Sequence, residues 1–158
     1  MNRDELLRLD NQLCFLLYAT FRKIAGLYRP LLDKLGITYP QYLVMLVLWE
    51  HGPLSVGEIG ARLHLDSGTL TPLLKRLEKQ ALVHRNRSAE DERRVTIRLT
   101  EAGAAMKASA YSIPEAMICN SGVTASQYWT LKKELDSLLA QIPTSGQCKK
   151  ETMHHEHP

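Results

Sequence analysis

The chain has 158 residues, 44% of them hydrophobic, and this length suits one compact domain because too little chain remains for two well-filled cores. No stretch approaches the ~20 apolar residues of a membrane span, and the start, MNRDELLRLDN, carries acids where a signal peptide carries a basic and then an apolar run. We therefore expect one soluble, cytoplasmic domain. The three cysteines, Cys14, Cys119 and Cys148, are odd in number and lack zinc-type spacing, so we expect no disulfide framework, no metal site and no cofactor.

The formal net charge of +3 comes from one segment of the chain. Between Asp66 and Arg98, eight basic residues oppose five acidic ones, whereas the remaining 12 basic and 12 acidic residues cancel. A solvated charged face would give the same count. A local surplus of cations nevertheless favours a surface that faces a polyanion.

Two helices are predicted in the first third of the chain. The first covers residues 4–35 and ends at Gly36, and the second covers residues 40–51 and ends at Gly52. Residues 43–49 are apolar on all sides, which is typical of a central helix buried in the core. Capping boxes mark three helix starts: Thr38 with Gln41, Ser55 with Glu58, and Thr124 with Gln127.

A helix-turn-helix and a hairpin follow. Two short helices, at about residues 55–63 and 67–80, are joined by only a few residues, which is the helix-turn-helix pattern. After Ala81 the apolar period changes from helical to alternating, with a polar turn, SAEDE, between two short strands. A hairpin with arginines at its tip, appended to a helix-turn-helix, is a winged helix, which we place at about residues 53–100.

The end of the chain is predicted to be helical and then disordered. Two helices cover about residues 101–118 and 124–141. The segment 143–158 contains turn formers and charges without an apolar period, so we predict a disordered tail. The fold class is therefore mainly α with a winged helix-turn-helix.

The run LHLDSGTLTPLLKRLEKQALVHRNRSAEDERRVTIRLTEAG resembles the winged helix-turn-helix of the MarR family of transcription regulators, including the Asp-x-Arg of the wing at Asp91 and Arg93. With LDNQLCFLLY, GLYRPLL and TYPQYLVMLVLWE upstream, the resemblance narrows to the organic-hydroperoxide-sensing branch and covers about residues 5–142. It implies a single domain over residues 1–142 that forms a cytoplasmic homodimer through helices at about 4–35 and 101–141. It also implies that the dimer represses its target until an organic hydroperoxide oxidises the N-terminal cysteine.

The predicted recognition helix supplies candidates for contacts to base edges of double-stranded operator DNA. Such a helix places its N-terminal residues nearest the bases of the major groove. Small polar side chains are found there at Ser67, Thr69 and Thr71, and the apolar ring of Pro72 could face a thymine methyl group. Pro72 lies beyond the first turn, where a proline removes one helix hydrogen bond.

Cations further along supply candidates for phosphate contacts. Lys75 and Arg76 lie one turn later and suit phosphates, while Arg93 and Arg94 on the wing can reach the adjacent minor groove, with Asp91 orienting Arg93. Leucines of the same helix are expected to pack in the core.

Cys14 is a candidate sensor, although a lone cysteine is usually inert core material. In the family two tyrosines approach the reactive cysteine, and the matching positions are Tyr28 and Tyr39. Tyr28 follows Cys14 by 14 residues, or about 21 Å of helix, so its phenol must come from a second subunit. A phenol that donates to a thiolate lowers the pKa of a thiol, and the thiolate attacks peroxides. Tyr18 either contributes or only packs.

Cys119 resembles the resolving thiol of a two-cysteine subclass, in which a disulfide prevents over-oxidation. Cys148 is a rival resolver in the tail, where the histidines of HHEH are interpreted as unstructured. Two other functions stay open. One is a regulator that binds a small aromatic ligand, with Cys14 structural, and the other is a cysteine peroxidase, for which neither a Pro-x-x-x-Thr-x-x-Cys motif nor a βαβ pattern is present.

Overall fold

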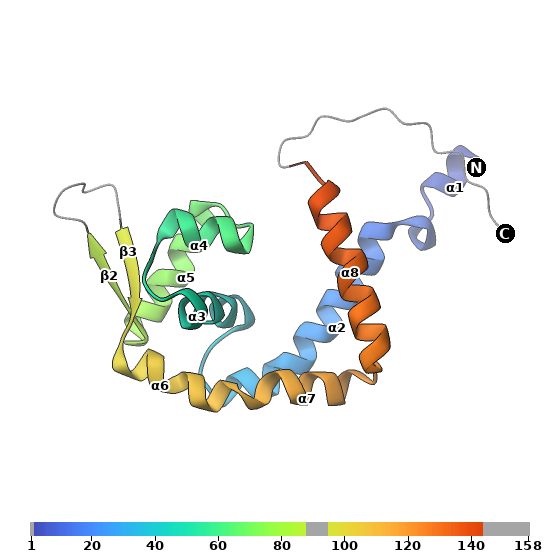
Figure 1. Cartoon of the computed structure of the whole chain (residues 1–158). Helices are drawn as coiled ribbons and strands as arrows, with labels where there is room; N and C mark the ends of the chain where they lie inside the picture. The colour runs from blue at the N-terminus through green and yellow to red at the C-terminus, as the bar shows by residue number, and fades with distance from the viewer. Residues whose placement is uncertain (1, 88–94, 144–158) are drawn as a thin grey trace. The chain divides into compact units, whose positions relative to one another are not determined.

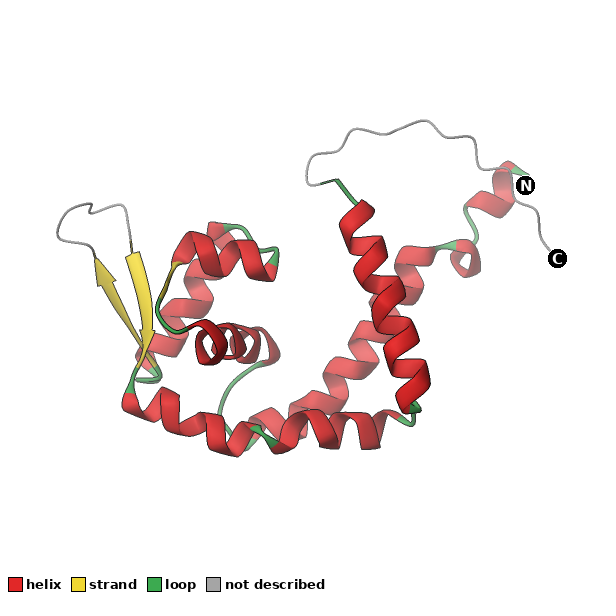
Figure 2. Cartoon of the chain, viewed as in Figure 1, coloured by secondary structure: helices red, strands yellow, loops and turns green. Residues whose placement is uncertain are grey.

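The computed structural model describes residues 2–87 and 95–143, which are mainly helical with one small sheet (Figure 1). Figure 2 shows the helices and strands by class. By its contacts the chain divides into two compact units, residues 1–121 and 122–158, which we describe separately. No helix of the described ranges is long and apolar enough to cross a membrane.

The first unit contains α1 (Arg3–Leu6), a 3-10 turn (Leu9–Asn11), α2 (Leu13–Asp33), α3 (Tyr39–His51), β1 (Leu54–Ser55), α4 (Val56–Leu63), α5 (Ser67–Lys79), β2 (Val83–Arg87), β3 (Val95–Leu99), α6 (Glu101–Ala110) and α7 (Ser112–Ser121). The second unit contains α8 (Ala125–Gln141). The predicted mainly α fold with a winged helix-turn-helix is confirmed.

The continuous helix predicted over residues 4–35 is wrong, because the chain leaves helical geometry before α2. Arg8 and Gln12 have extended backbone, with ψ of 137° and 106°. The side-chain amide of Gln12 donates to the carbonyl oxygens of Leu6 (2.6 Å) and Arg8 (3.1 Å). A side chain thus occupies carbonyls that a continuous helix would pair with backbone N–H groups. Consequently Cys14 lies in the first turn of α2 rather than in the middle of a helix.

The helix α3 lies in the core, as its apolar pattern predicted. Six of its residues are buried, namely Gln41, Tyr42, Val44, Met45, Val47 and Leu48. It packs against α2, α4, α5 and α6, so each of these elements covers part of its surface (Figure 1). The predicted all-round burial of residues 43–49 is not complete, because Leu43 and Trp49 are half-buried and Leu46 has 39% of its surface exposed.

The two helices of the helix-turn-helix, α4 and α5, each begin at a side-chain cap, of which the sequence predicted the one at Ser55. Ser55 and Glu58 form the predicted capping box, in which the backbone N–H of Ser55 donates to Glu58 Oε2 (2.8 Å). Asp66 caps α5, since its Oδ1 accepts from the backbone N–H of Thr69 (2.8 Å). Between the two helices His64 has a positive φ of 53°, which turns the chain sharply after α4.

The hairpin of β2 and β3 is confirmed and belongs to a three-stranded antiparallel sheet in the order β1-β3-β2. Ile97 in the central strand is fully buried and faces Leu54 on one side and Arg85 on the other. The strand β1 was not predicted, because two residues are too few to show an alternating pattern. The SAEDE turn, with Asp91, Arg93 and Arg94, lies outside the described residues, as does the predicted tail from residue 144 onward.

The single helix predicted over residues 101–118 is wrong, because it is divided into α6 and α7 near Tyr111. Pro114 lies in the first turn of α7 and has no N–H, so the helical hydrogen bond to Ala110 cannot form. The helix α7 then continues to Ser121, so Cys119 lies in its last turn.

Gly103 fixes the position of α6 against the end of the helix-turn-helix. A Cβ atom on Gly103 would lie 2.0 Å from the carbonyl oxygen of Leu82. The carbonyl of Gly103 accepts from Trp49 Nε1 (2.9 Å), and its N–H donates to Thr100 Oγ1 (2.9 Å). The hydrogen bond from Trp49 therefore anchors α6 at a point where no room remains beside Leu82 for a Cβ atom.

We predict that Gly103→Ala lowers the free energy of unfolding by about 3 kcal/mol, the upper end of the usual cost of overpacking, because α6 must move away from Leu82. Urea unfolding followed by circular dichroism measures this change. The control is Gly57→Ala in α4, where a Cβ meets nothing within 4 Å and stability is unchanged or rises by about 0.5 kcal/mol. Equal losses in the two variants would contradict the prediction.

Candidate redox site and nucleic-acid interface

Cys14 is an exposed, free thiol near the start of α2. Its neighbours Phe15 and Leu16 expose 37% and 56% of their surface. Tyr18, one turn further along, is also exposed, and its hydroxyl accepts from Arg22 Nη1 (3.3 Å). Within one chain, Cys14 is therefore not the buried filler that a lone cysteine usually is.

An unusual amount of apolar surface surrounds Cys14. Large hydrophobic side chains exposed in this part of the chain are Leu6, Leu7, Leu9, Leu13, Phe15, Leu16, Leu17, Tyr18, Phe21 and Ile24. Within the second unit, α8 exposes Tyr128, Trp129, Leu131, Leu135 and Leu139. So many exposed apolar residues in one segment mark a protein interface. Each unit thus presents a surface that another chain can cover.

Tyr28 and Tyr39 lie side by side in an aromatic cluster between α2 and α3. Their ring centroids are 4.8 Å apart, and the ring of Phe21 lies 5.8 Å from that of Tyr39. Burial raises the pKa of Tyr39 above its ordinary value of 10.0. Burial and the charge of Tyr39 also raise the pKa of Tyr42, whose ring lies 6.1 Å from that of Tyr28. The phenol of Tyr39 therefore stays neutral near pH 7, in the form that donates a hydrogen bond.

The structure brings Tyr28 and Tyr39 together but keeps Tyr28 away from Cys14 of the same chain. Cys14 and Tyr28 lie on one helix, 14 residues and about 21 Å apart. Tyr39 lies on α3, where its ring contacts those of both Tyr28 and Phe21. A contact between the phenol of Tyr28 and a Cys14 sulfur therefore requires a second copy of the chain.

Cys119 is likewise free and exposed. It lies near the end of α7, which packs against α2. Ile113 and Met117 are the buried residues of α7 and hold this helix in the core. Cys148 lies outside the described residues.

The predicted base-contacting side chains lie in the first turns of α5. Ser67, Thr69 and Pro72 are exposed, whereas Thr71 is half-buried. Two hydroxyl protons are already used within the chain, because Thr69 Oγ1 donates to Asp66 Oδ2 (2.9 Å) and Thr71 Oγ1 donates to the carbonyl of Ser67 (2.6 Å). Hydrogen bonds from Thr69, with that from its backbone N–H the largest, hold the pKa of Asp66 below its ordinary value. These threonines can therefore accept hydrogen bonds from a ligand more readily than donate them.

The cations of this face include one that sequence reasoning missed. Lys75 and Arg76 are exposed on α5, as expected. Arg85 on β2 lies 3.6 Å from Glu78 and lines a hollow with Ser67, beside the start of α5. Its Nε has no hydrogen-bond partner. The alternating pattern of β2 could have identified Arg85, because it lies two residues after buried Val83 and therefore on the same face of the strand.

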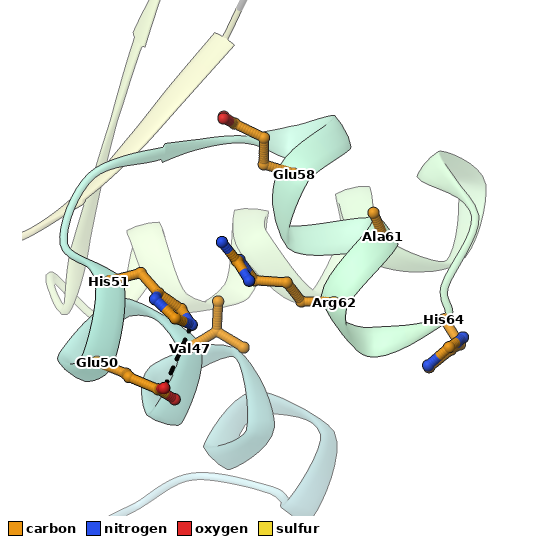
Figure 3. A pocket seen from close by; sticks show the side chains of 7 residues that line it. All are labelled: Val47, Glu50, His51, Glu58, Ala61, Arg62 and His64. Carbon is orange, nitrogen blue, oxygen red and sulfur yellow. Dashed lines mark ion pairs between the residues drawn. The ribbon is translucent and has the colours of Figure 1, made fainter. Parts of the chain in front are cut away.

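Two further hollows lie away from Cys14. Figure 3 shows one of about 620 Å³ between α3 and α4, where His51 Nε2 lies 3.6 Å from Glu50 Oε1 and Arg62 approaches from α4. The other, of about 420 Å³, is lined mainly by aromatic and aliphatic side chains, including Tyr42 and Trp49. Within the part of the chain that the structure describes, no group of three or more side chains could hold a metal ion.

These observations define a class of protein, namely a winged-helix chain whose first long helix carries an exposed thiol. A family model described as the transcriptional regulator SarA/Rot matches residues 26–109. The organic hydroperoxide resistance transcriptional regulator of Bacillus subtilis (strain 168) is 53% identical over 141 residues, which cover 89% of this chain and 96% of that protein.

Solved structures share the architecture. AbfR is a protein of Staphylococcus epidermidis. The structure of reduced AbfR bound to DNA has a TM-score of 0.70 at 40% identity, and the match covers 87% of this chain and 96% of the AbfR chain. Disulfide-formed AbfR has a lower TM-score of 0.58 at 39% identity, with coverage of 87% and 92%. A MarR mutant from E. coli, complexed with operator DNA, has a TM-score of 0.68 at 27% identity and covers 78% and 91%. The chain belongs to the MarR family of transcription regulators, in the branch of the organic hydroperoxide resistance regulators.

Proposed function

We propose that this chain is a redox-sensing transcriptional repressor. It binds operator DNA as a reduced homodimer, in the cytoplasm, and leaves the DNA when an organic hydroperoxide oxidises Cys14. The observation that carries this proposal is the separation of exposed Cys14 from Tyr28 on α2, because only a second copy can bring that phenol, with Tyr39 beside it, to the sulfur. The apolar side chains around Cys14 favour an organic hydroperoxide over a small polar one.

The first chemical step is a two-electron oxidation of sulfur. The Cys14 thiolate attacks the terminal oxygen of the hydroperoxide, so an S–O bond forms as the O–O bond breaks. Cys14 becomes a sulfenic acid, and the alkoxide takes up a proton and leaves as an alcohol. Tyr28 and Tyr39 of the partner act as donors to the thiolate, because a hydrogen bond to the charged form of a thiol favours that form.

The second step joins two cysteines across the dimer. The thiol of the partner's Cys119 attacks the sulfenic sulfur, and a disulfide forms as the S–O bond breaks. The hydroxyl group of the sulfenic acid and the proton of the thiol leave together as water. A disulfide needs Cα atoms within about 7 Å of each other. Where the reduced dimer holds the sulfurs further apart, α2 or the segment 111–123 moves to close the distance. That movement changes the spacing of the two winged helices of the dimer. They then no longer match operator half-sites about 34 Å apart, and the DNA is released.

The DNA-binding face is formed by α5 and the wing. Toward the base edges we place Ser67, Thr69, Thr71 and Pro72, and toward the phosphates Lys75 and Arg76. We also assign Arg93 and Arg94, which lie outside the described residues, to the minor groove, with Asp91 orienting Arg93. Arg85 belongs to the same face, since it lines a hollow with Ser67. The protein acts as a regulator rather than an enzyme, because each Cys14 is oxidised once and waits for reduction.

Lys75→Ala and Arg93→Ala should each weaken operator binding while the dimer stays intact. Loss of one phosphate contact should reduce the slope of log affinity against log salt by about one. Fluorescence anisotropy over a salt series measures both quantities, and gel filtration measures the dimer. Lys132→Ala on α8, where the ammonium group pairs with Asp136, is the control for loss of one lysine. If affinity and slope are unchanged for both test variants, these residues do not bind phosphate.

Tyr28→Phe and Tyr39→Phe should each slow the oxidation of Cys14 by about tenfold, because a hydrogen bond to a charged group contributes about 1.5–3 kcal/mol. Reduced-state operator binding should be unchanged. Stopped-flow measurement of Cys14 oxidation checks the rate, with Tyr111→Phe, an exposed phenol, as the control. Equal rates in the wild type and both variants would show that these phenols do not assist the thiolate.

The central test of the function follows operator binding and covalent state after an organic hydroperoxide. The wild type should release the operator and show a covalent dimer on non-reducing electrophoresis. Cys14→Ser should abolish both responses. Cys119→Ser should abolish the covalent dimer and stop at a sulfenic acid that over-oxidises, which mass spectrometry detects.

Cys148→Ser is the control, and it should behave like the wild type. A covalent dimer that depends on Cys148, or a disulfide confined to one chain, would overturn the assignment of Cys119. Operator release that persists in Cys14→Ser would overturn the redox mechanism.

A further inference from the structure

Two glutamine side chains join the start of α3 to the end of the recognition helix α5. Gln41 is buried, with 3% of its surface exposed. Its Oε1 accepts from the N–H (2.8 Å) and the hydroxyl (3.0 Å) of Thr38, and its Nε2 donates to Gln80 Oε1 (2.9 Å). Gln80 Nε2 in turn donates to the carbonyl oxygen of Gly36 (2.7 Å). These hydrogen bonds link residues that are 39 and 44 positions apart in sequence.

The direction of this chain of hydrogen bonds is fixed at both ends. The backbone N–H of Thr38 can only donate, so Gln41 must turn its oxygen toward Thr38 and its NH₂ group toward Gln80. The carbonyl of Gly36 can only accept, so Gln80 must turn its NH₂ group toward Gly36. A flip of either amide would place two acceptors or two donors against each other. The pair therefore has one satisfied arrangement.

The pair binds the backbone just before Tyr39, at Gly36 and Thr38. Gly36 and Thr38 lie just before Tyr39, which is the first residue of α3 and contacts Tyr28. Gln80 directly follows the last residue of α5 and comes three residues before β2. The side chain of Gln80 thus connects the segment before Tyr39 to the junction between the recognition helix α5 and β2.

We infer that Gln41 and Gln80 are positioning residues that couple Tyr39 to the recognition helix. The inference rests on the proposed function, in which the state of the partner's Cys14 changes the hydrogen bond made by Tyr39. A displacement of the Gly36–Tyr39 segment moves the carbonyl that Gln80 binds and the cap that Gln41 binds. Because a satisfied amide pair resists stretching, α5 and the start of the wing follow. The same bonds carry the effect in reverse, so bound DNA favours the reduced arrangement of Tyr39.

The test compares the operator dissociation constants of the oxidised and the reduced protein. We define the coupling ratio as the oxidised value divided by the reduced value, measured by anisotropy before and after one equivalent of cumene hydroperoxide. Gln80→Met keeps the length of the side chain and removes both hydrogen bonds. Gln80→Glu keeps an acceptor for Gln41 but places a carboxylate oxygen against the carbonyl of Gly36.

Both variants should lower the coupling ratio by about three- to tenfold, the range that the net free energy of one hydrogen bond gives. Gln80 is exposed, so both variants should fold, which thermal unfolding of the same samples checks. Gln141→Met is the matched control. It removes an exposed glutamine at the end of α8 that bonds only within its own helix, to Ser137 Oγ (3.0 Å), and it should keep the wild-type ratio.

A purely structural role for Gln80 would weaken reduced and oxidised binding equally and leave the ratio unchanged, and that result would overturn the inference. Failure of the proposed function gives a different result. In that case the wild-type ratio itself would be one, which would overturn the function and with it this coupling.

Discussion

The rise of the α2 helix is the constraint on which the proposed site depends. A helix advances about 1.5 Å per residue, so Cys14 and Tyr28 are held about 21 Å apart on one rigid element. Neither rotamers nor loop motion can bring them together while α2 is intact. A site that uses both must therefore be shared by two chains, and the apolar side chains exposed along the N-terminal half of α2 are what such a pairing requires.

Much of the fold could be predicted from local patterns. Capping boxes at Thr38 and Ser55 placed helix starts within one residue, and alternation placed both strands of the hairpin. The two wrong helices, predicted over residues 4–35 and 101–118, have a common cause of error. Each has an apolar period that continues without a break through the point where the structure divides it. Gln12 ends helical geometry by bonding earlier carbonyls, and Pro114 removes one backbone donor. Such competition depends on single side chains, which a periodicity averaged over several turns does not detect.

The candidate site shows the same division between what sequence reveals and what it does not. The separation of Cys14 from Tyr28 follows from counting residues, and the structure adds that Tyr39 lies against Tyr28. The amide pair of Gln41 and Gln80 could not be predicted, since it joins residues 39 apart without any repeating pattern. Gln41 was recognised only as half of a capping box. Its second hydrogen bond depends on tertiary packing, which brings the end of α5 to the start of α3.

The free energy for the proposed switch can come from the phenols themselves. Tyr39 is half-buried, and burial keeps its hydroxyl neutral, so it needs an acceptor more than an exposed phenol does. A thiolate is a charged acceptor, whereas a sulfenic acid or a disulfide is neutral and accepts more weakly. A buried donor that loses its partner costs about 1–3 kcal/mol. Each of the two sites in a dimer has one Tyr39, so the cost arises twice, and moving the segment before Tyr39 relieves it. In the proposed mechanism, oxidation therefore acts by removing an acceptor, and the hydrogen bonds from that segment through Gln41 and Gln80 to the end of α5 are a direct route by which its movement can change the DNA-binding face.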